Sequence, residues 1–341
     1  MKAAVIEKVG KIVLTDAPVP VLSDGEALIK VKYVGICGSD IHVLMGHHPT
    51  AVYPVIPGHE FVGEISEVKG AGSERFQKGD IVAAQEVFSC GVCDACAKGE
   101  DNVCRELKII GIHTDGGFAE YVKVKTHKTY KLAQDIDLEL AALIEPLAVA
   151  VHDVRRSGLK VGETALVIGG GPIGILIAIV ARVAGARKIV VSEINEYRLK
   201  FAKAMGFSTI NPAEEGFEQK LTELGEGRGF DVSFEAAGAP SAIGTCLDFT
   251  KSTGTVVVVA MSERPRVVDT GKIFAKELTL VGVRIHSQYN FLGSVDLVRS
   301  GMLNRDLKKL VSKVFSLNDV LAAFEEAQHG KENFKVLVRL D

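Results

Sequence analysis

Four cysteines fall within fifteen residues of this 341-residue chain, which has six cysteines in all. They follow the pattern C-x-x-C-x-x-C, seven further residues and a last cysteine, at Cys90, Cys93, Cys96 and Cys104. Four thiolates in one short loop can close a tetrahedral shell around Zn²⁺ and leave no position open. Iron–sulfur ligation is the competing interpretation, and a disulfide is a weaker one. We predict a structural zinc.

A glycine-rich turn lies between the apolar run ALVI and the long apolar segment ILIAIVARVAG. Its G-x-G-x-x-G pattern and the two residues inside it are Gly169, Gly171, Pro172, Ile173 and Gly174. Between a strand and a helix, such glycines permit a tight turn, a close approach of backbone to pyrophosphate and close helix packing. The free N–H groups of the helix N-terminus then face the phosphates. The motif predicts a dinucleotide site.

A carboxylate stands where such sites bind ribose, about twenty residues beyond the last glycine. Glu193 in VVSEIN can accept hydrogen bonds from both ribose hydroxyls and would repel a 2′-phosphate, so NAD is favoured over NADP. Arg198 is the complication, because an arginine nearby can receive that phosphate. The alternatives for Arg198 are a solvated helix residue or a cover over the adenine.

The elements that position these groups change in character along the chain. Residues 1 to about 150 are rich in short alternating or β-branched runs with glycines between them, which indicates a mostly-β domain. From about 160, apolar strands alternate with helical segments, as in parallel βαβ units. Past about 285 we expect two helices and a terminal strand, FKVLVRL, which the sequence alone does not place.

Composition excludes several classes of function. The net charge is only -3, which favours neither nucleic acid nor an anionic membrane surface, and Trp is absent. The start of the chain has no signal-peptide pattern. The apolar run 165–181 is broken by glycines and a proline, so we interpret it as a buried strand and helix and not as a membrane span. We expect a cytoplasmic protein.

Three further segments carry chemically useful side chains: CGSDIH at 37–42, GHE at 58–60 and EPL at 145–147. Each alone is unremarkable, since a lone cysteine is usually a small core residue. Together with the cysteine loop, DGGFAEY at 115–121 and the glycine motif, they resemble the zinc-containing medium-chain dehydrogenases over essentially the whole chain. The resemblance is strongest to the polyol and sugar-acid branch. One departure is Lys69, where the family pattern has a glycine.

The resemblance implies an α/β protein with two domains. Residues 1–150 and 286–341 would form a mostly-β, GroES-like catalytic domain, and residues 151–285 a Rossmann domain with a doubly wound parallel sheet. It further implies an NAD-dependent polyol dehydrogenase with two Zn²⁺ per chain and a small-molecule polyol or sugar-acid substrate. A homo-oligomer, tetramer or dimer, is also implied, with no nucleic-acid or membrane partner.

The resemblance makes Cys37 and His59 ligands of a catalytic zinc that keeps one position open. The related alcohol dehydrogenases add a second cysteine, but no cysteine lies near Glu145, and Cys246 is in the βαβ half. Oxygen must therefore complete the shell, from Glu60, from Glu145, or from both through water. The alternative for Glu145 is an acceptor for the metal-bound water.

Further roles follow from the resemblance. Ser39 would contact the substrate oxygen, His42 would continue a proton relay, and Asp40 would orient His59. Alternatively, Ser39 caps a turn and His42 is a surface residue. Polar residues that could line the substrate pocket are His47, His48, Tyr53, His113 and Arg284.

Two rival hypotheses remain open. One is a zinc-free quinone reductase of the same superfamily, and the other is a non-catalytic nucleotide-binding regulatory protein, since a fold does not determine function. The set Cys37, His59 and Glu60, together with Ser39, disfavours both.

Overall fold

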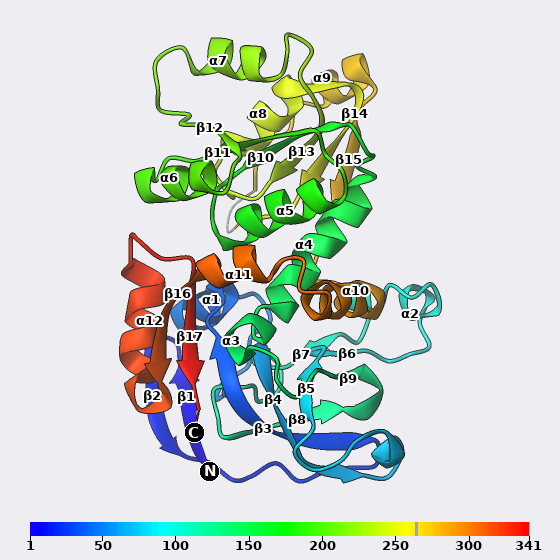
Figure 1. Cartoon of the computed structure of the whole chain (residues 1–341), viewed down its shortest axis with the longest axis vertical. Helices are drawn as coiled ribbons and strands as arrows, with labels where there is room; N and C mark the ends of the chain where they lie inside the picture. Colours follow the sequence, from blue (N-terminus) through cyan, green and yellow to red (C-terminus); the bar gives the residue numbers. More distant parts are fainter. Residues whose placement is uncertain (263–264, 341) are drawn as a thin grey trace. The chain divides into compact units, whose positions relative to one another are not determined.

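The computed structural model of the chain describes residues 1–262 and 265–340. Contacts divide it into two compact units (Figure 1). Unit 1 comprises Met1–Ala148 and His286–Asp341, and unit 2 comprises Val149–Ile285.

Unit 2 contains a six-stranded sheet in which every neighbouring pair is parallel. The strands are β10 (Thr164–Ile168), β11 (Lys188–Ser192), β12 (Ser208–Ile210), β13 (Phe230–Glu235), β14 (Thr250–Val258) and β15 (Thr279–Gly282). Their order is β12-β11-β10-β13-β14-β15, so the chain leaves β10 in one direction and later returns beside it. This reversal defines a doubly wound sheet with a switch point between β10 and β13. The predicted Rossmann fold is confirmed.

Helices connect these strands because parallel strands need crossover connections. They are α5 (Pro172–Val183), α6 (Glu196–Ala204), α7 (Phe217–Leu224), α8 (Ala242–Phe249) and α9 (Thr270–Lys276). Central strand β10 is buried along its whole length, and so are the residues of α5 from Gly174 to Ala181. The apolar run 165–181 is thus a core strand and helix.

Unit 1 is built on a seven-stranded sheet in the order β16-β17-β3-β4-β5-β9, with β8 also paired to β3. Its strands are β3 (Glu26–Gly35), β4 (Glu60–Lys69), β5 (Ile81–Ala84), β8 (Tyr121–Lys125), β9 (Thr129–Lys131), β16 (Val311–Ser316) and β17 (Lys335–Arg339). All pairs are antiparallel except β16 with β17. The mostly-β prediction for this part of the chain is confirmed. The terminal strand β17, unplaced by sequence, lies between β16 and β3.

Smaller elements complete unit 1. Two hairpins are β1 (Lys2–Lys8) with β2 (Lys11–Asp16), and β6 (Val87–Phe88) with β7 (Lys108–Ile109). The α-helices are α1 (Gly38–Met45), α2 (Asp94–Ala97), α3 (Leu138–Ala141), α10 (Gln288–Arg299), α11 (Asn304–Leu310) and α12 (Val320–His329), and α4 (Ile144–Ser157) begins in this unit. Two α-helices were expected past residue 285, and the described part has three, because the short α11 follows α10 directly.

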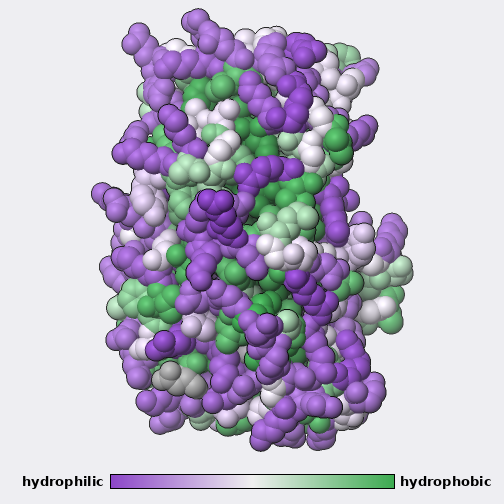
Figure 2. All heavy atoms as spheres, viewed as in Figure 1, coloured by the Kyte–Doolittle hydropathy of each residue, from purple (hydrophilic) through white to green (hydrophobic). Residues whose placement is uncertain are grey.

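Polar and apolar side chains separate as expected for a folded chain in water. On the face drawn in Figure 2, hydrophilic side chains cover most of the surface, with hydrophobic patches between them. Among the described helices, none combines the length and the apolar character that crossing a bilayer requires.

Candidate functional site

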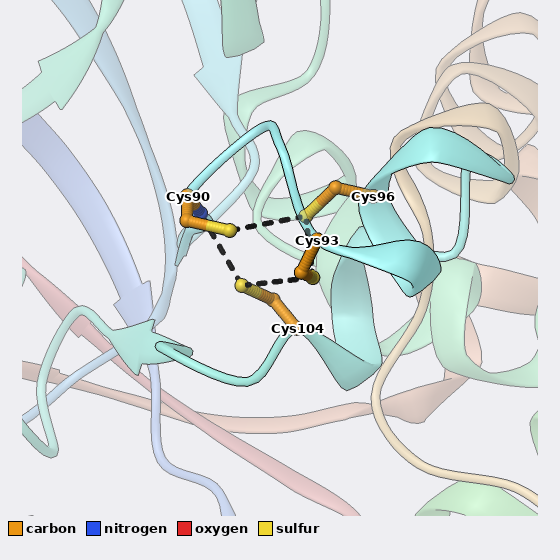
Figure 3. A group of neighbouring side chains, drawn as sticks. All are labelled: Cys90, Cys93, Cys96 and Cys104. Carbon is orange, nitrogen blue, oxygen red and sulfur yellow. Dashed lines mark hydrogen bonds between the residues drawn. The ribbon is translucent and has the colours of Figure 1, made fainter.

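The four cysteines of the loop between β6 and β7 turn their sulfurs toward one another (Figure 3). The Sγ–Sγ distances are 4.0 Å for Cys90–Cys96, 3.5 Å for Cys93–Cys96 and 3.9 Å for Cys93–Cys104. A tetrahedron of sulfurs, each about 2.3 Å from Zn²⁺, has edges of about 3.8 Å. All six cysteines of the chain are free. The spacing therefore fits a four-thiolate zinc site and not a pair of disulfides.

Backbone N–H groups favour the thiolate at two of these cysteines, whereas burial and the neighbouring Cys93 raise the pKa of Cys96 to about 11. The backbone N–H groups of Cys96 and Arg105 lower the pKa of Cys93 to about 6. The N–H of Cys90 donates to Cys104 Sγ at 3.2 Å and lowers the pKa of that thiol too. A thiolate is the form that binds metal.

A second group brings together Cys37, His59 and Glu60, each of which offers one ligand atom within 4.8 Å of the others. Strand pairing explains the meeting: Gly35, near the end of β3, lies opposite Glu60 at the start of β4. Cys37 follows the first strand and caps α1, while His59 precedes the second. A Cβ on Gly35 would collide with Glu60 Oε2, so only glycine leaves room for that carboxylate.

Asp40 holds the geometry of this group from the first turn of α1. Its Oδ2 accepts the N–H of Cys37 at 2.9 Å, and its Oδ1 accepts the N–H of Gly58 at 3.1 Å and lies 3.5 Å from His59 Nδ1. Burial opposes a charged imidazole, but Asp40 and Cys37 together raise the pKa of His59 well above its ordinary value. Ser39 Oγ lies 3.3 Å from the other ring nitrogen, Nε2.

Lys335, on β17, is a member of the site that sequence reasoning missed. It is only 3% exposed. Its Nζ lies 2.5 Å from Glu60 Oε1, also pairs with Oε2, and donates to the carbonyl of Ile36 at 3.3 Å. Burial lowers the pKa of Lys335, but the charges of Glu60 and Cys37 raise it by a larger amount. The net shift of the pKa is upward. The feature of the sequence that could have revealed this residue is a lysine inside the apolar run FKVLVRL.

Glu145 is not part of the group formed by Cys37, His59 and Glu60. It belongs to another group, with Glu86 and His286, whose ligand atoms all lie within 4.8 Å of one another. His286 Nε2 lies 3.2 Å from Glu86 Oε2 and 3.4 Å from Glu145 Oε1. All three side chains are buried. Burial opposes the charge on His286, yet the two carboxylates raise its pKa to about 10. Neither Glu86 nor His286 was predicted as a site residue; a charge within the apolar run around Glu86 was the only signal for either.

The two groups nevertheless lie within electrostatic reach. Burial and Glu86 raise the pKa of Glu145, while the charge of His59 lowers it. The charge of Glu145 also raises the pKa of Lys335. Glu145 is thus close enough to the Cys37 group for their charges to interact.

The remaining pocket candidates make contacts within unit 1, with the exception of Arg284. The rings of His42 and His47 lie 6.2 Å apart, and those of His48 and His113 lie 6.3 Å apart. The hydroxyl of Tyr53 donates to the carbonyl of Val43 at 2.5 Å. Arg284 belongs to unit 2, whereas the other four pocket candidates belong to unit 1.

The glycine turn of unit 2 has the form that its sequence predicts. Gly169 has φ +104°, and a Cβ there would lie 2.8 Å from backbone atoms of Ala236 and Ala237, just after β13. Gly171 caps α5, Pro172 is its first residue, and Ile173 follows. A Cβ on Gly174 would collide with the carbonyl of Gly169, so the helix packs closely there.

Glu193 and Arg198 both lie beside this turn. Glu193 Oε2 accepts the N–H of Gly170 at 2.8 Å, and Oε1 accepts those of Ile194 and Asn195. The guanidinium of Arg198 comes within 3.7 Å of the place that a Cβ on Gly171 would occupy. Its buried Nε has no hydrogen-bond partner in the structure. Arg198 is therefore not a fully solvated helix residue, and its unpaired donor suits an anion near the turn.

Comparisons with known proteins agree with this architecture. Residues 23–134 match the alcohol dehydrogenase GroES-like domain, and residues 172–300 match the zinc-binding dehydrogenase domain. The chain is 38% identical to 2-dehydro-3-deoxy-L-galactonate 5-dehydrogenase of Pseudoalteromonas atlantica, covering 92% of this chain and 91% of that protein. It is 34% identical to L-threonine 3-dehydrogenase of Escherichia coli O1:K1 / APEC, covering 96% of each.

Solved structures give the same result. A zinc-binding dehydrogenase from Sinorhizobium meliloti 1021, bound to NADP, matches with TM-score 0.91 and 32% identity over 99% of this chain and 98% of that one. The rspB alcohol dehydrogenase of E. coli CFT073, complexed with NADH, matches with TM-score 0.93 and 32% identity over 99% of each chain.

Fold, donor groups and relatives together define a zinc-type, nicotinamide-dependent oxidoreductase. The chain belongs to the zinc-containing medium-chain dehydrogenase/reductase family, as its motifs had indicated.

Proposed function

We propose that this chain transfers a hydride between a secondary alcohol of a polyol or sugar acid and NAD, at a zinc ion held by Cys37, His59 and Glu60. The convergence of a sulfur, a nitrogen and an oxygen donor within 4.8 Å carries the proposal. Zn²⁺ accepts this mixture of ligands, and three protein ligands leave the fourth position open, as in catalytic zinc sites.

The buried atoms of the site fit such an ion. Asp40 lies against Nδ1 of His59, which leaves Nε2 for the metal. Both oxygens of Glu60 pair with Lys335, which keeps this buried carboxylate charged beside the other two donors. Zinc bound there would lower the pKa of a substrate hydroxyl, and NAD would accept the hydride.

The side chains around these donors divide the remaining work. Asp40 orients His59. Ser39, whose Oγ lies 3.3 Å from Nε2, is placed to accept the proton of the substrate hydroxyl and to pass it toward His42. Glu145 would reach the metal through a water, since its carboxylate lies with Glu86 and His286 and not with the three ligands.

The preference for NAD rests on Glu193, whose carboxylate lies at the glycine turn, where it would oppose a 2′-phosphate. Arg198 supplies the counter-argument, and the two solved structures described above contain one cofactor each, NADP and NADH. We assign to Arg198 contact with the pyrophosphate, because its guanidinium lies beside Gly171, the residue that caps α5.

We further propose that Cys90, Cys93, Cys96 and Cys104 hold a second, structural zinc, which makes two ions per chain. The sugar-acid relative, at 38% identity, favours a sugar acid or polyol as substrate over threonine, the substrate in the name of the relative at 34%. The cytoplasmic location and a dimer or tetramer remain proposals that follow from the family.

One screen tests the function. Purified protein is assayed for metal content and for reduction of NAD and NADP with aldonates, deoxy-aldonates, polyols and threonine, before and after treatment with a chelator. We expect two zinc ions per chain and NAD reduction with a sugar acid or polyol that chelation abolishes. A chain that turns over only quinones, or that stays active with the Cys37 site emptied, would contradict the proposal.

A further inference from the structure

The four-cysteine loop carries a buried carboxylate that no zinc interpretation uses. Asp101 lies in the 3₁₀ turn Asp101–Val103, between the third and fourth cysteines, and is 8% exposed. Its Oδ2 accepts from Lys128 Nζ at 2.7 Å, and its Oδ1 accepts the backbone N–H of Gln288 at 3.0 Å. One side chain thus ties the loop to two distant segments of unit 1.

The second of these bonds caps a helix. Gln288 is the first residue of α10, and the preceding N-cap residue, Ser287, makes no side-chain capping bond. The first N–H groups of a helix need acceptors from outside it, and a carboxylate is favoured there by the helix dipole. Asp101 supplies this acceptor from 187 residues away in the chain. Gln288 Nε2 adds a bond to the carbonyl of His127 at 2.8 Å.

His286 lies two residues before Gln288 and is fully buried. Its carbonyl accepts from Gln85 Nε2 at 3.2 Å, and the backbone N–H of Gln85 donates to the carbonyl of Lys128 at 2.9 Å. The backbone at His286 is therefore held on one side by Gln85 and on the other by Asp101, and both of these residues bind Lys128. These bonds hold the imidazole ring of His286 beside Glu86 and Glu145.

We propose that Asp101 is a positioning residue, through which the four-cysteine loop sets the position of His286 and thereby of Glu145. The consequence for turnover rests on the proposed function, whereas the mechanical link does not. The loop has too few residues to form a core of its own, so bound metal would fix the turn that carries Asp101. The four-cysteine centre would then influence the reacting centre without contacting it.

A pair of substitutions at Gln288 isolates the capping bond. Gln288→Ala removes the side-chain bond to His127 but keeps the backbone N–H. Gln288→Pro removes that N–H as well, and proline is well tolerated at the first position of a helix. The difference between the two variants therefore reports on the N–H that donates to Asp101. A second pair compares Asp101→Ala with Asp94→Ala, a carboxylate of the same loop whose side chain is 93% exposed.

Three measurements are made on the zinc-loaded protein: amide hydrogen exchange of peptides spanning 284–292, zinc affinity of the Cys37 site by chelator competition, and kcat against KM. We expect exchange of the 284–292 amides to be at least ten-fold faster in Gln288→Pro than in Gln288→Ala, and likewise in Asp101→Ala relative to Asp94→Ala. Glu145 would act on the metal through a bound water, and outer-shell partners contribute about ten-fold to metal affinity. Zinc affinity at the Cys37 site should therefore fall by about that factor within each pair, with the loss of turnover in kcat.

Equal exchange and equal zinc affinity within the pairs would overturn the proposal. If Asp101→Ala does not fold, the Gln288 pair decides alone. Exchange and metal affinity need no substrate, so a wild-type protein that is inactive toward every alcohol would refute the proposed function and still allow this link to be judged.

Discussion

The two candidate metal centres of unit 1 are assembled in different ways. The four-cysteine centre draws all its donors from one loop, and backbone N–H groups of the same loop favour the thiolate at Cys93 and Cys104. The Cys37 centre takes its donors from the ends of β3 and β4, and side chains from other elements surround it. One centre is local, and the other depends on the tertiary fold.

The surroundings differ as much as the donors. Around the four cysteines, identical sulfurs lie at nearly equal distances, which suits a closed shell. Around Cys37, two of the three donors have an auxiliary group: Asp40 for His59, and Lys335 for Glu60 across 275 residues of chain. The charges of the closed centre are met by backbone N–H groups of its own loop, whereas those of the open centre are met by side chains from distant segments.

The largest expected effect comes from Cys37→Ala, which removes one of three donors at the open centre. Zinc content should fall from two ions to one per chain. Turnover should fall about 10³-fold or more, because a Lewis-acid metal contributes several kcal/mol and each 1.36 kcal/mol is a factor of ten. Metal analysis and kcat measure both. Retention of two zinc ions together with full activity would break the distinction between the centres.

In contrast to Cys37→Ala, Cys104→Ser should lower the stability of the fold more than the rate of the reaction. Loss of a structural metal belongs to the few changes that cost about 4 kcal/mol or more. We expect one zinc per chain, now at Cys37, and a lower unfolding free energy in denaturant titrations. The control is Cys246→Ala, which removes a fully buried thiol outside both centres. Unaltered stability in Cys104→Ser would mean that the loop does not depend on its metal.

The same contrast explains what the sequence could predict. The cysteine spacing and the glycine turn are local, so the folding of a few residues suffices to bring their groups together. The conformation of Gly169 and its close contact with Ala236 follow from that turn and from the parallel strands beside it. The fold class could likewise be inferred from alternating strands and helices, and the β-rich half from its short runs.

Other members of the site could not be predicted because they depend on which strands pair. Lys335 meets Glu60 only because β17 lies against β3, and the sequence did not place that strand. Glu86 and His286 lie 200 residues apart and need the segment before α10 to return to the end of β5. Glu145, predicted as a ligand or as an acceptor for bound water, lies with these two residues for the same reason.

Lys335→Met sharpens the comparison further, because it leaves Glu60 buried without its counter-charge. Breaking a buried ion pair by removing one partner costs about 3–5 kcal/mol. If Glu60 binds zinc directly, metal offsets part of this loss, so the destabilisation should be greater in chelator-stripped than in zinc-loaded protein. The control is Lys32→Met, which breaks a partly exposed pair with Glu64. Equal losses with and without zinc would exclude Glu60 as a ligand.

Ser39→Ala is the mildest of these changes. It removes a hydroxyl that lies 3.3 Å from His59 Nε2 but leaves every proposed ligand in place. Positioned proton transfer contributes about 10²-fold or more, so kcat should fall by about that factor while zinc stays at two ions per chain. Ser39→Thr keeps a hydroxyl and should recover part of the rate. If Ala and Thr behave alike, the hydroxyl of Ser39 takes no part in proton transfer, and the open centre passes its proton to solvent by another route.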